Sequence, residues 1–160
     1  MKKEKVNILM VCLGNICRSP VADGIMRKKA KVHNLKIKVD SAGTSGYHNG
    51  ENPDRRSQQN ALKNGVDISN LISRKFTVED FDDFDLIYVM DSSNQRDVLS
   101  LSRNENDRNK VSLILNELYP GENRSVPDPY FGGEDGFENV FRMLDEACEK
   151  IALKLLQSRD

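Results

Sequence analysis

The sequence has few cysteines and little histidine, and no long apolar run. Three cysteines in 160 residues, an odd number, do not suit a small secreted domain built on disulfide bonds. The apolar stretch behind the basic N-terminus covers only residues 6–13 and contains Asn7, far short of the ~20 residues that span a bilayer. No small-residue cleavage site follows it, so it predicts a buried strand rather than a signal peptide. We therefore expect a cytoplasmic protein that does not enter a membrane.

The charge is nearly balanced, with a formal net value of −1. No field of either sign would draw the chain to nucleic acid or to a membrane surface, although a local basic site for an anion stays possible. Apolar residues make up 38% and charged residues 31%, which is typical of a globular protein. Without an internal repeat, low-complexity tract or linker, residues 1–160 are expected to form one domain, and a monomer is expected.

Short apolar segments alternate with helix-like segments along the chain. Four segments rich in β-branched residues, almost continuously apolar, are typical of parallel strands buried on both faces. Predicted strands cover residues 6–11, 37–39, 86–90 and 111–115, and predicted helices cover 20–33, 54–64, 92–101 and 137–155. Pro20 is expected at the first helical position, Ser92 at an N-cap, and Asn64 with Gly65 at a C-cap. This alternation predicts an α/β fold, a doubly wound four-stranded parallel sheet with helices on both faces.

The loop after the first predicted strand has the residue types that a phosphate loop needs. Ligands of open α/β sheets bind beyond the carboxyl ends of the strands, where this loop lies. Gly14, without a Cβ, can adopt backbone angles that turn N–H groups inward, and Asn15 tolerates a left-handed conformation. Such N–H groups and the start of the following helix form an anion site. The predicted phosphate-binding residues are Leu13, Gly14, Asn15, Ile16, Cys17, Arg18 and Ser19.

Cys12 and Arg18 are separated by five residues, which lets one tight loop place both on the same phosphorus. The loop N–H groups and Arg18 would stabilise a thiolate at Cys12, the predicted nucleophile. The planar guanidinium of Arg18 can hold two phosphoryl oxygens, and the Ser19 hydroxyl could steady the thiolate. The alternative is that Cys12 and Cys17 are small core residues in a strand–helix turn. A nucleotide-binding loop is a poor alternative, because its glycine–lysine pattern is absent.

Residues 11–20 resemble the signature of the low-molecular-weight protein tyrosine phosphatases. The resemblance runs through nearly the whole chain, with residues 40–44, 80–81, 89–91 and 128–130 in the family's order. It implies a flavodoxin-like fold, no cofactor, and hydrolysis of phosphotyrosine monoesters through a cysteinyl-phosphate intermediate. No metal site is expected, because Cys12 and Cys17 lack the C-x-x-C spacing and have no histidine partners. Expected partners are phosphotyrosine-containing proteins, with phosphate, vanadate or sulfate as anion ligands.

The segment around Asp128 acquires a role only through this resemblance. Two prolines flank Asp128, and by itself the segment is typical of an ordinary turn. The resemblance implies that Asp128 is the general acid for the leaving group and then the base that activates water. Asp128 must be protonated when it meets the substrate, so a bell-shaped rate profile with an acidic optimum is expected.

Apolar and aromatic residues are expected to set the substrate. The predicted cleft residues are Leu13, Ile16, Tyr47, Tyr130 and Phe131. Tyr130 and Phe131 could alternatively only anchor their loop. Related arginine phosphatases typically have threonine where this chain has Ile16, and arsenate reductases of the same fold use further cysteines near residues 80–90, which this chain lacks. A module that only binds phosphorylated ligands would be expected to have lost Cys12, Arg18 or Asp128.

The resemblance also implies supporting roles. Asn15 would brace the loop, with Ser41, just past the second strand, as its hydrogen-bond partner. Vertebrate members add a histidine in the segment corresponding to residues 69–74, where Asn70 is the candidate substitute here. Cys17 could form a reversible disulfide with Cys12. Asp91 is expected to order the start of a helix, and the two histidines, His33 and His48, are expected at the surface or in structural contacts.

Overall fold

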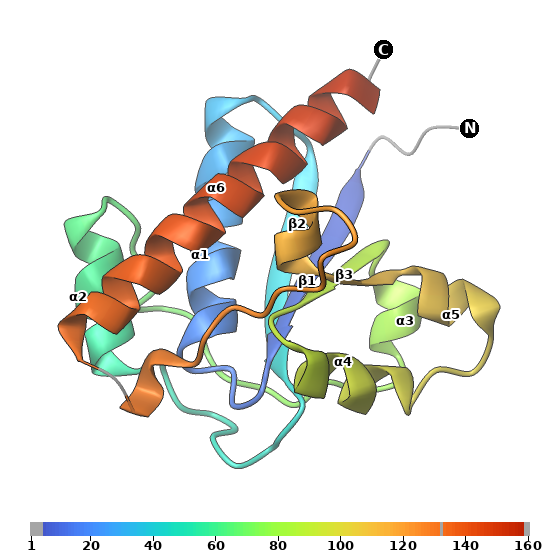
Figure 1. The fold of residues 1–160 in the computed structure, drawn as a ribbon, viewed down its shortest axis with the longest axis horizontal. Helices are drawn as coiled ribbons and strands as arrows, with labels where there is room; N and C mark the ends of the chain where they lie inside the picture. Colours follow the sequence, from blue (N-terminus) through green and yellow to red (C-terminus); the bar gives the residue numbers. More distant parts are fainter. Residues whose placement is uncertain (1–4, 132, 159–160) are drawn as a thin grey trace.

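A parallel sheet forms the centre of the molecule (Figure 1). The computed structural model describes residues 5–131 and 133–158. In this part of the chain β1 (Val6–Cys12), β2 (Ile37–Gly43), β3 (Leu86–Val89) and β4 (Val111–Leu113) form a four-stranded sheet in the order β2-β1-β3-β4. All neighbouring strands are parallel. The predicted doubly wound α/β fold is confirmed.

The predicted helices are present with shifted ends. They are α1 (Arg18–Val32), α2 (Arg55–Lys63), α4 (Ser92–Leu99) and α6 (Glu134–Ser158). The sequence did not predict the short helices α3 (Asp80–Asp83) and α5 (Glu105–Asn109), or the 3₁₀ turns η1 (Ile114–Glu117) and η2 (Pro129–Phe131). These elements are too short to produce a helical repeat of apolar residues. Among the described residues, no helix is long and apolar enough to cross a bilayer.

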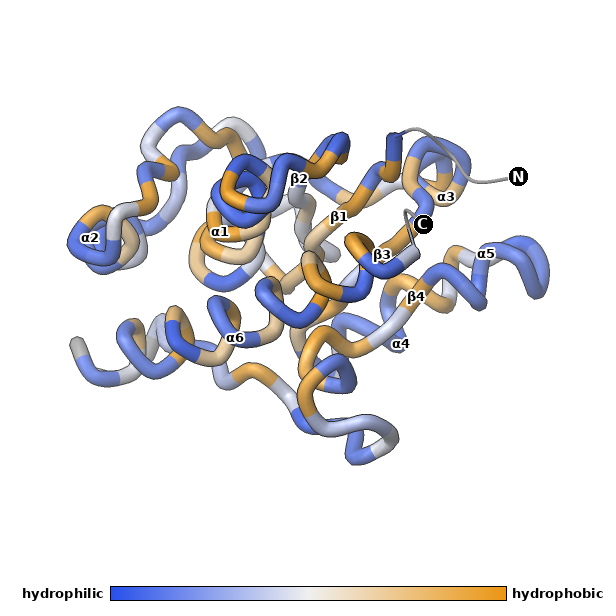
Figure 2. Tube along the Cα trace, turned by 90° about the horizontal axis from the view of Figure 1, so that it is seen from above, coloured by the Kyte–Doolittle hydropathy of each residue, from blue (hydrophilic) through white to orange (hydrophobic). Residues whose placement is uncertain are grey.

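The central strand β1 is covered on both faces. Ile8 and Met10 pack into a core shared with α1 and α6, whereas Leu9 and Val11 pack into a second core with Phe81 and other residues on the opposite face. Figure 2 shows hydrophobic residues along the strands and on the helix sides that face them. Successive side chains of a strand point to opposite faces, so a strand covered on both sides must be apolar throughout.

Two strand ends differ from the prediction. β2 continues through Ser41 to Gly43 because these residues stay paired with β1, up to Cys12 opposite Gly43. The prediction that Ser41 lies past the strand is therefore wrong. β4 ends at Leu113, and the following two residues begin the turn η1. Apolar composition alone could not locate these ends, since the turn residues are as buried as the strand.

Helix starts also differ from the prediction. The N-cap of α4 is Asp91, whose Oδ1 accepts from the Asn94 amide at 2.8 Å, and not Ser92. Pro20 is the third residue of α1 rather than the first, because the helix begins at Arg18. Its missing N–H still costs nothing, since the first four amides of a helix have no intrahelical acceptor. The C-cap at Asn64 is confirmed, with Gly65 at a φ of 83°.

One buried carboxylate joins α1 to β2. Asp23 is fully buried, and its Oδ1 accepts from Arg27 Nε at 2.6 Å, while Arg27 Nη2 also donates to the Val39 carbonyl at 2.9 Å. Burial raises the pKa of Asp23 from 3.8 to about 6, and Arg27 offsets part of this effect. The protonated form is therefore favoured in the folded state relative to the unfolded chain.

Protonation of Asp23 should stabilise the fold in mild acid. Its contribution is fully present below about pH 4 and is lost as the pH rises through about 6. Between about pH 7.5 and pH 5 the wild type should gain about 1.4 kcal/mol relative to Asp23→Asn, which cannot titrate. Urea unfolding of both proteins at the two pH values measures this difference. A constant difference would show that burial does not perturb Asp23.

Candidate active site

The loop after β1 brings the predicted nucleophile to the carboxyl edge of the sheet. Cys12 is the last residue of β1 and is only 3% exposed. Its Sγ accepts from the Asn15 amide at 3.3 Å and lies 3.0 Å from Ser19 Oγ. Both contacts can stabilise a thiolate, because each partner can present a hydrogen to the sulfur.

Asn15 has the predicted left-handed conformation, with a φ of 57°, and is buried. Its Nδ2 donates to Ser19 Oγ at 2.7 Å. Since Ser19 Oγ accepts this bond, its own hydrogen is available for Cys12 Sγ, or for the Ala42 carbonyl at 3.5 Å. Asn15 therefore determines how Ser19 can act on the sulfur.

Arg18, the first residue of α1, lies against loops that follow two other strands. Its Nη1 donates to Asp91 Oδ2 at 2.7 Å and to the Val126 carbonyl at 3.0 Å. Burial alone lowers the pKa of Arg18, but Cys12, Asp91 and Asp128 together raise it above its usual value. The guanidinium is consequently held in place and remains charged.

The two carboxylate oxygens of Asp91 make two different contacts. Oδ1 caps α4, as the expected role at a helix start requires, while Oδ2 accepts from Arg18. The contact with Arg18 was not predicted from the sequence. The only signal for it is that Asp91 follows β3, which neighbours β1 in the sheet, and this neighbour relation appears only in the tertiary structure.

Asp128 lies on the loop between β4 and α6, beside Arg18. Its Oδ2 is 3.8 Å from Arg18 Nη2, and its Oδ1 accepts from the Tyr130 amide at 3.0 Å. The side chain is 38% exposed, so it can be reached from the solvent. The loop is anchored where the Val126 amide donates to the Met90 carbonyl at 2.8 Å.

A pocket of about 400 Å³ brings these residues together. Its lining comes from the phosphate loop, from the segment after β2 and from the Asp128 loop. The lining residues are Cys12, Leu13, Gly14, Ile16, Cys17, Arg18, Ser45, Tyr47, His48, Asp128 and Tyr130. The three residues predicted to be catalytic thus share one cavity, although Asp128 is more than 100 positions from Cys12 and Arg18 in the chain.

Four of the five predicted cleft residues line this pocket. Leu13 and Tyr130 are about half exposed and Tyr47 is 85% exposed, whereas Ile16 is mostly buried and packs with Cys17 and Phe137. The side chain of the fifth, Phe131, lies outside what the structure describes. Arg56 contacts the Tyr130 ring, with its Cζ 5.3 Å from the ring centroid.

Gly14 lies close to His48, since a Cβ at Gly14 would lie 3.1 Å from His48 Cδ2, a tight contact. One expectation about the loop needs correction. The side chain of Asn15 bonds to Ser19 and to the Arg74 amide instead of Ser41, while the Ser41 hydroxyl bonds to Asp23.

The remaining cysteines and histidines have distinct environments. Burial, followed by the Asp54 carboxylate, raises the pKa of the Cys17 thiol to about 12. Cys148 is fully buried in the main core, as predicted. His33 pairs with Glu149 at 3.0 Å in a structural contact. His48 pairs with Glu51 and lines the pocket, a location that the sequence did not indicate.

No group of three or more His, Cys, Asp or Glu side chains forms a metal site within residues 5–131 and 133–158. The cavity instead offers a buried sulfur, a fixed guanidinium and a carboxylate. This combination, placed on a doubly wound α/β sheet, defines a protein with a cysteine–arginine phosphate loop.

Comparison with known proteins identifies the family. Residues 7–160 match the family model described as low molecular weight phosphotyrosine protein phosphatase. The human low molecular weight phosphotyrosine protein phosphatase is 40% identical over 151 residues, which cover 92% of this chain and 94% of the human protein. The chain therefore belongs to the low molecular weight phosphotyrosine protein phosphatase family.

Solved structures agree with this assignment. A protein tyrosine phosphatase from Entamoeba histolytica with Hepes in its active site superposes with a TM-score of 0.89 at 38% identity, covering 97% of this chain and 99% of that one. YfkJ from Bacillus subtilis superposes with a TM-score of 0.90 at 32% identity over the full length of both chains. The fold and the family are thus established together.

Proposed function

We propose that this protein hydrolyses phosphotyrosine in proteins through two displacements at Cys12. The observation that supports this most strongly is the shared pocket of Cys12, Arg18 and Asp128, in which Arg18 Nη2 lies 3.8 Å from Asp128 Oδ2. A nucleophile, a cationic clamp and a proton donor are thereby available to one phosphoryl group.

In the first displacement the Cys12 thiolate attacks phosphorus. A sulfur–phosphorus bond forms and the bond from phosphorus to the tyrosine oxygen breaks. Asp128 gives its proton to the departing oxygen, which leaves as neutral tyrosine. The partial exposure of Asp128 is consistent with this role, because a tyrosine that enters the pocket from the solvent can then reach the carboxyl group.

In the second displacement water replaces the sulfur. Asp128, now ionised, removes a proton from water as the oxygen attacks phosphorus, and the sulfur–phosphorus bond breaks. Cys12 leaves as a thiolate, stabilised by Ser19 and by the Asn15 amide. Inorganic phosphate is released and Asp128 is protonated again.

Arg18 would hold the phosphoryl group in both displacements. Both of its hydrogen bonds to the described residues use Nη1, so Nε and Nη2 are available for two phosphoryl oxygens. Charge that develops on those oxygens in each transition state is stabilised without reorganisation, because Asp91 already holds the guanidinium.

The pocket walls favour an aromatic substrate. The phosphate of tyrosine stands further from the peptide backbone than that of serine, which suits a buried sulfur at the base of a cleft. Leu13, Tyr47 and Tyr130 offer apolar surfaces for a flat ring. Ile16, where related arginine phosphatases typically have threonine, favours phosphotyrosine over phosphoarginine.

The proposal retains three further expectations. A cytoplasmic location suits an enzyme whose nucleophile must remain a free thiol, since that compartment keeps cysteines reduced. One domain acting as a monomer would suffice for the reaction. A Cys12–Cys17 disulfide remains a prediction, and the raised pKa of Cys17 would make its attack on an oxidised Cys12 slow near neutral pH.

Peptides with phosphotyrosine, phosphoserine or phosphoarginine in one flanking sequence test this function. We expect kcat/KM for phosphotyrosine to exceed the other two by about 100-fold. The activity should need no added metal, should be inhibited by vanadate, and should yield a phosphorylated Cys12 after acid quenching. Equal or faster release from phosphoarginine would instead make the chain an arginine phosphatase.

A further inference from the structure

Ser73 and Arg74 form a segment that supports the phosphate loop from outside the pocket lining. Each lies 59 positions after the loop residue that it contacts. Ser73 Oγ donates to the Gly14 carbonyl at 3.0 Å, and the Arg74 amide donates to Asn15 Oδ1 at 3.1 Å. The segment lies along the end of β2, where the Gly43 amide donates to the Arg74 carbonyl at 2.8 Å. It therefore joins the phosphate loop to the sheet.

The Arg74 amide determines the orientation of the Asn15 side chain. A backbone N–H can only donate, so the atom facing it must be the amide oxygen of Asn15, and Nδ2 then faces Ser19. As a result Ser19 Oγ accepts from Asn15 and can donate its own hydrogen to Cys12. A reversed Asn15 amide would take the Ser19 hydrogen away from the sulfur.

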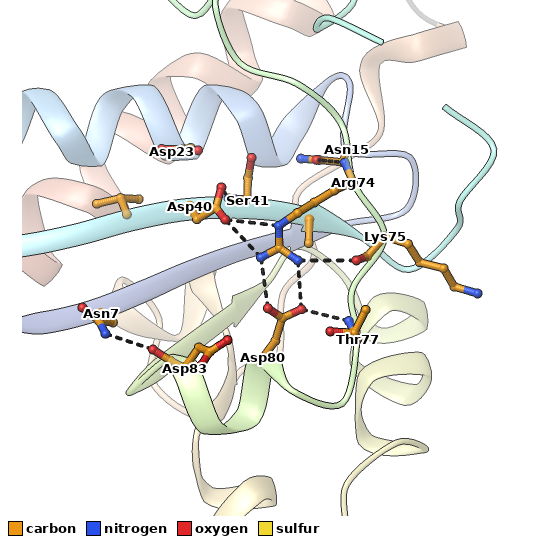
Figure 3. A network of polar contacts seen from close by, with 12 residues as sticks. Asn7, Asn15, Asp23, Asp40, Ser41, Arg74, Lys75, Thr77, Asp80 and Asp83 are labelled. Atoms are coloured by element: carbon orange, nitrogen blue, oxygen red, sulfur yellow. Dashed lines mark hydrogen bonds and ion pairs between the residues drawn. The ribbon is translucent and has the colours of Figure 1, made fainter. Parts of the chain in front are cut away.

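The Arg74 side chain is itself held between two aspartates (Figure 3). Its Nη1 and Nη2 donate to the two carboxylate oxygens of Asp80, both at 3.0 Å, and its Nε donates to Asp40 Oδ2 at 3.1 Å. Asp80 is buried and also accepts from the Thr77 amide at 2.9 Å. Such a planar, doubly bonded ion pair fixes the direction of the guanidinium and of the backbone that carries it.

We propose that Arg74 is a positioning residue for the phosphatase reaction. Its ion pairs with Asp40 and Asp80 hold its backbone amide against Asn15, which in turn aims the Ser19 hydroxyl at Cys12. This inference rests on the proposed function. It also identifies what braces the loop in place of the expected Asn70, whose side chain is exposed.

The Ser19 bond matters most when Cys12 leaves phosphorus. In the first displacement the bond stabilises the thiolate before it reacts, and in the second it stabilises the thiolate that is being formed. Loss of alignment should therefore slow hydrolysis of the cysteinyl phosphate more than its formation. When that hydrolysis limits turnover, kcat and KM fall together and kcat/KM changes little.

Arg103 offers a matched control for Arg74. It too lies between two aspartates, donating from Nε to Asp107 at 2.9 Å and from Nη2 to Asp82 at 2.7 Å. The exposed fractions of the side chains are similar, 35% for Arg74 and 43% for Arg103, and each arginine has one buried and one exposed partner. Arg103 does not line the pocket.

Arg74→Met and Arg103→Met should lower the melting temperature by comparable amounts. Only Arg74→Met should lower kcat, by about tenfold, which is typical of losing a bond to a charged group. KM should fall in parallel, and rapid-quench experiments should show more cysteinyl phosphate at steady state. Arg74→Lys, which retains the charge but not the planar fork, should restore part of kcat and provides a milder variant.

A double variant, Arg74→Met with Ser19→Ala, tests whether Arg74 affects kcat through Ser19. If Arg74 acts through Ser19, adding Arg74→Met to Ser19→Ala should lower kcat by less than about twofold further. The inference is overturned if the two losses multiply, or if Arg74→Met and Arg103→Met have equal kcat values. A measurement on the wild-type protein distinguishes failure of the Arg74 inference from failure of the proposed function. If the wild type forms no cysteinyl phosphate, the proposed function is refuted, whatever the Arg74 variants do.

Discussion

Replacement of Cys12 by serine should reduce turnover of phosphotyrosine peptides by about four orders of magnitude. The serine hydroxyl is far less acidic than a thiol, so the contacts from Ser19 and the Asn15 amide cannot hold it as an anion near neutral pH. Phosphate binding should survive, because Arg18 and the loop amides are unchanged. Steady-state kinetics with isothermal titration of phosphate measures both quantities.

Cys17→Ser is the matched control for this experiment. Cys17 lies in the same loop and is also buried, but the raised pKa of its thiol makes it a poor nucleophile. We expect Cys17→Ser to retain activity within about threefold of the wild type. Substantial turnover by Cys12→Ser, or a phosphorylated residue other than Cys12 in the quenched wild type, would refute the proposed mechanism.

Asp128→Asn should affect substrates according to their leaving groups. For phenyl phosphate, whose phenolate departs poorly, kcat/KM should fall by about 10³-fold, because general acid catalysis typically contributes this much. For dinitrophenyl phosphate, whose leaving group needs no proton, the loss should be about tenfold or less. Asparagine can still accept the bond from the Tyr130 amide, so the loop should keep its conformation.

The ratio of the two losses, rather than either alone, identifies the acid. Because kcat/KM reports only the steps up to the first irreversible one, it isolates the displacement in which Asp128 is proposed to donate its proton. Equal losses for both substrates would mean that Asp128 acts through charge or position, for instance through its contact with Arg18. That result would remove Asp128 from the role of proton donor.

The arrangement of charges around Arg18 follows from the order of the strands. Cys12 ends β1, Asp91 follows β3 and Asp128 lies on the loop after β4. Parallel strands deliver all three loops to one edge of the sheet, so the proposed nucleophile, the carboxylate that holds the guanidinium and the proposed proton donor meet there. The fold thus assembles the site from segments that have no contact along the chain.

Much of this could be predicted from short stretches of sequence. Each strand of the sheet contains a short apolar segment, and the phosphate loop lies within ten consecutive residues, 11–20, in which Cys12, Asn15 and Arg18 have fixed spacings. The left-handed conformation of Asn15 and the long last helix were predicted for the same reason, since both depend on neighbours within a few positions. The role of Asp128 could be predicted only from the family resemblance, because a proline-flanked aspartate is by itself typical of a turn.

Other features depended on which segments the fold brings together. The length of β2 was set by its pairing with β1, not by its own composition, and this pairing carries the chain to Gly43. A Cβ at Gly43 would lie 2.7 Å from the Leu13 carbonyl, so the two backbones approach closely there. The Gly43 amide also donates to the Arg74 carbonyl, and the Arg74 amide in turn donates to Asn15, a neighbour that no local pattern could indicate.

The fold class, the predicted phosphate loop and the predicted nucleophile follow from the order of the amino acids alone, because these depend on local spacing and periodicity. What holds Arg18 and what orients Asn15 become apparent only in the folded chain. Those partners, Asp91 and the Arg74 amide, are 73 and 59 positions away from the residues they hold. Hydrogen bonds act only at short range, and the chain reaches that range only after the sheet has formed.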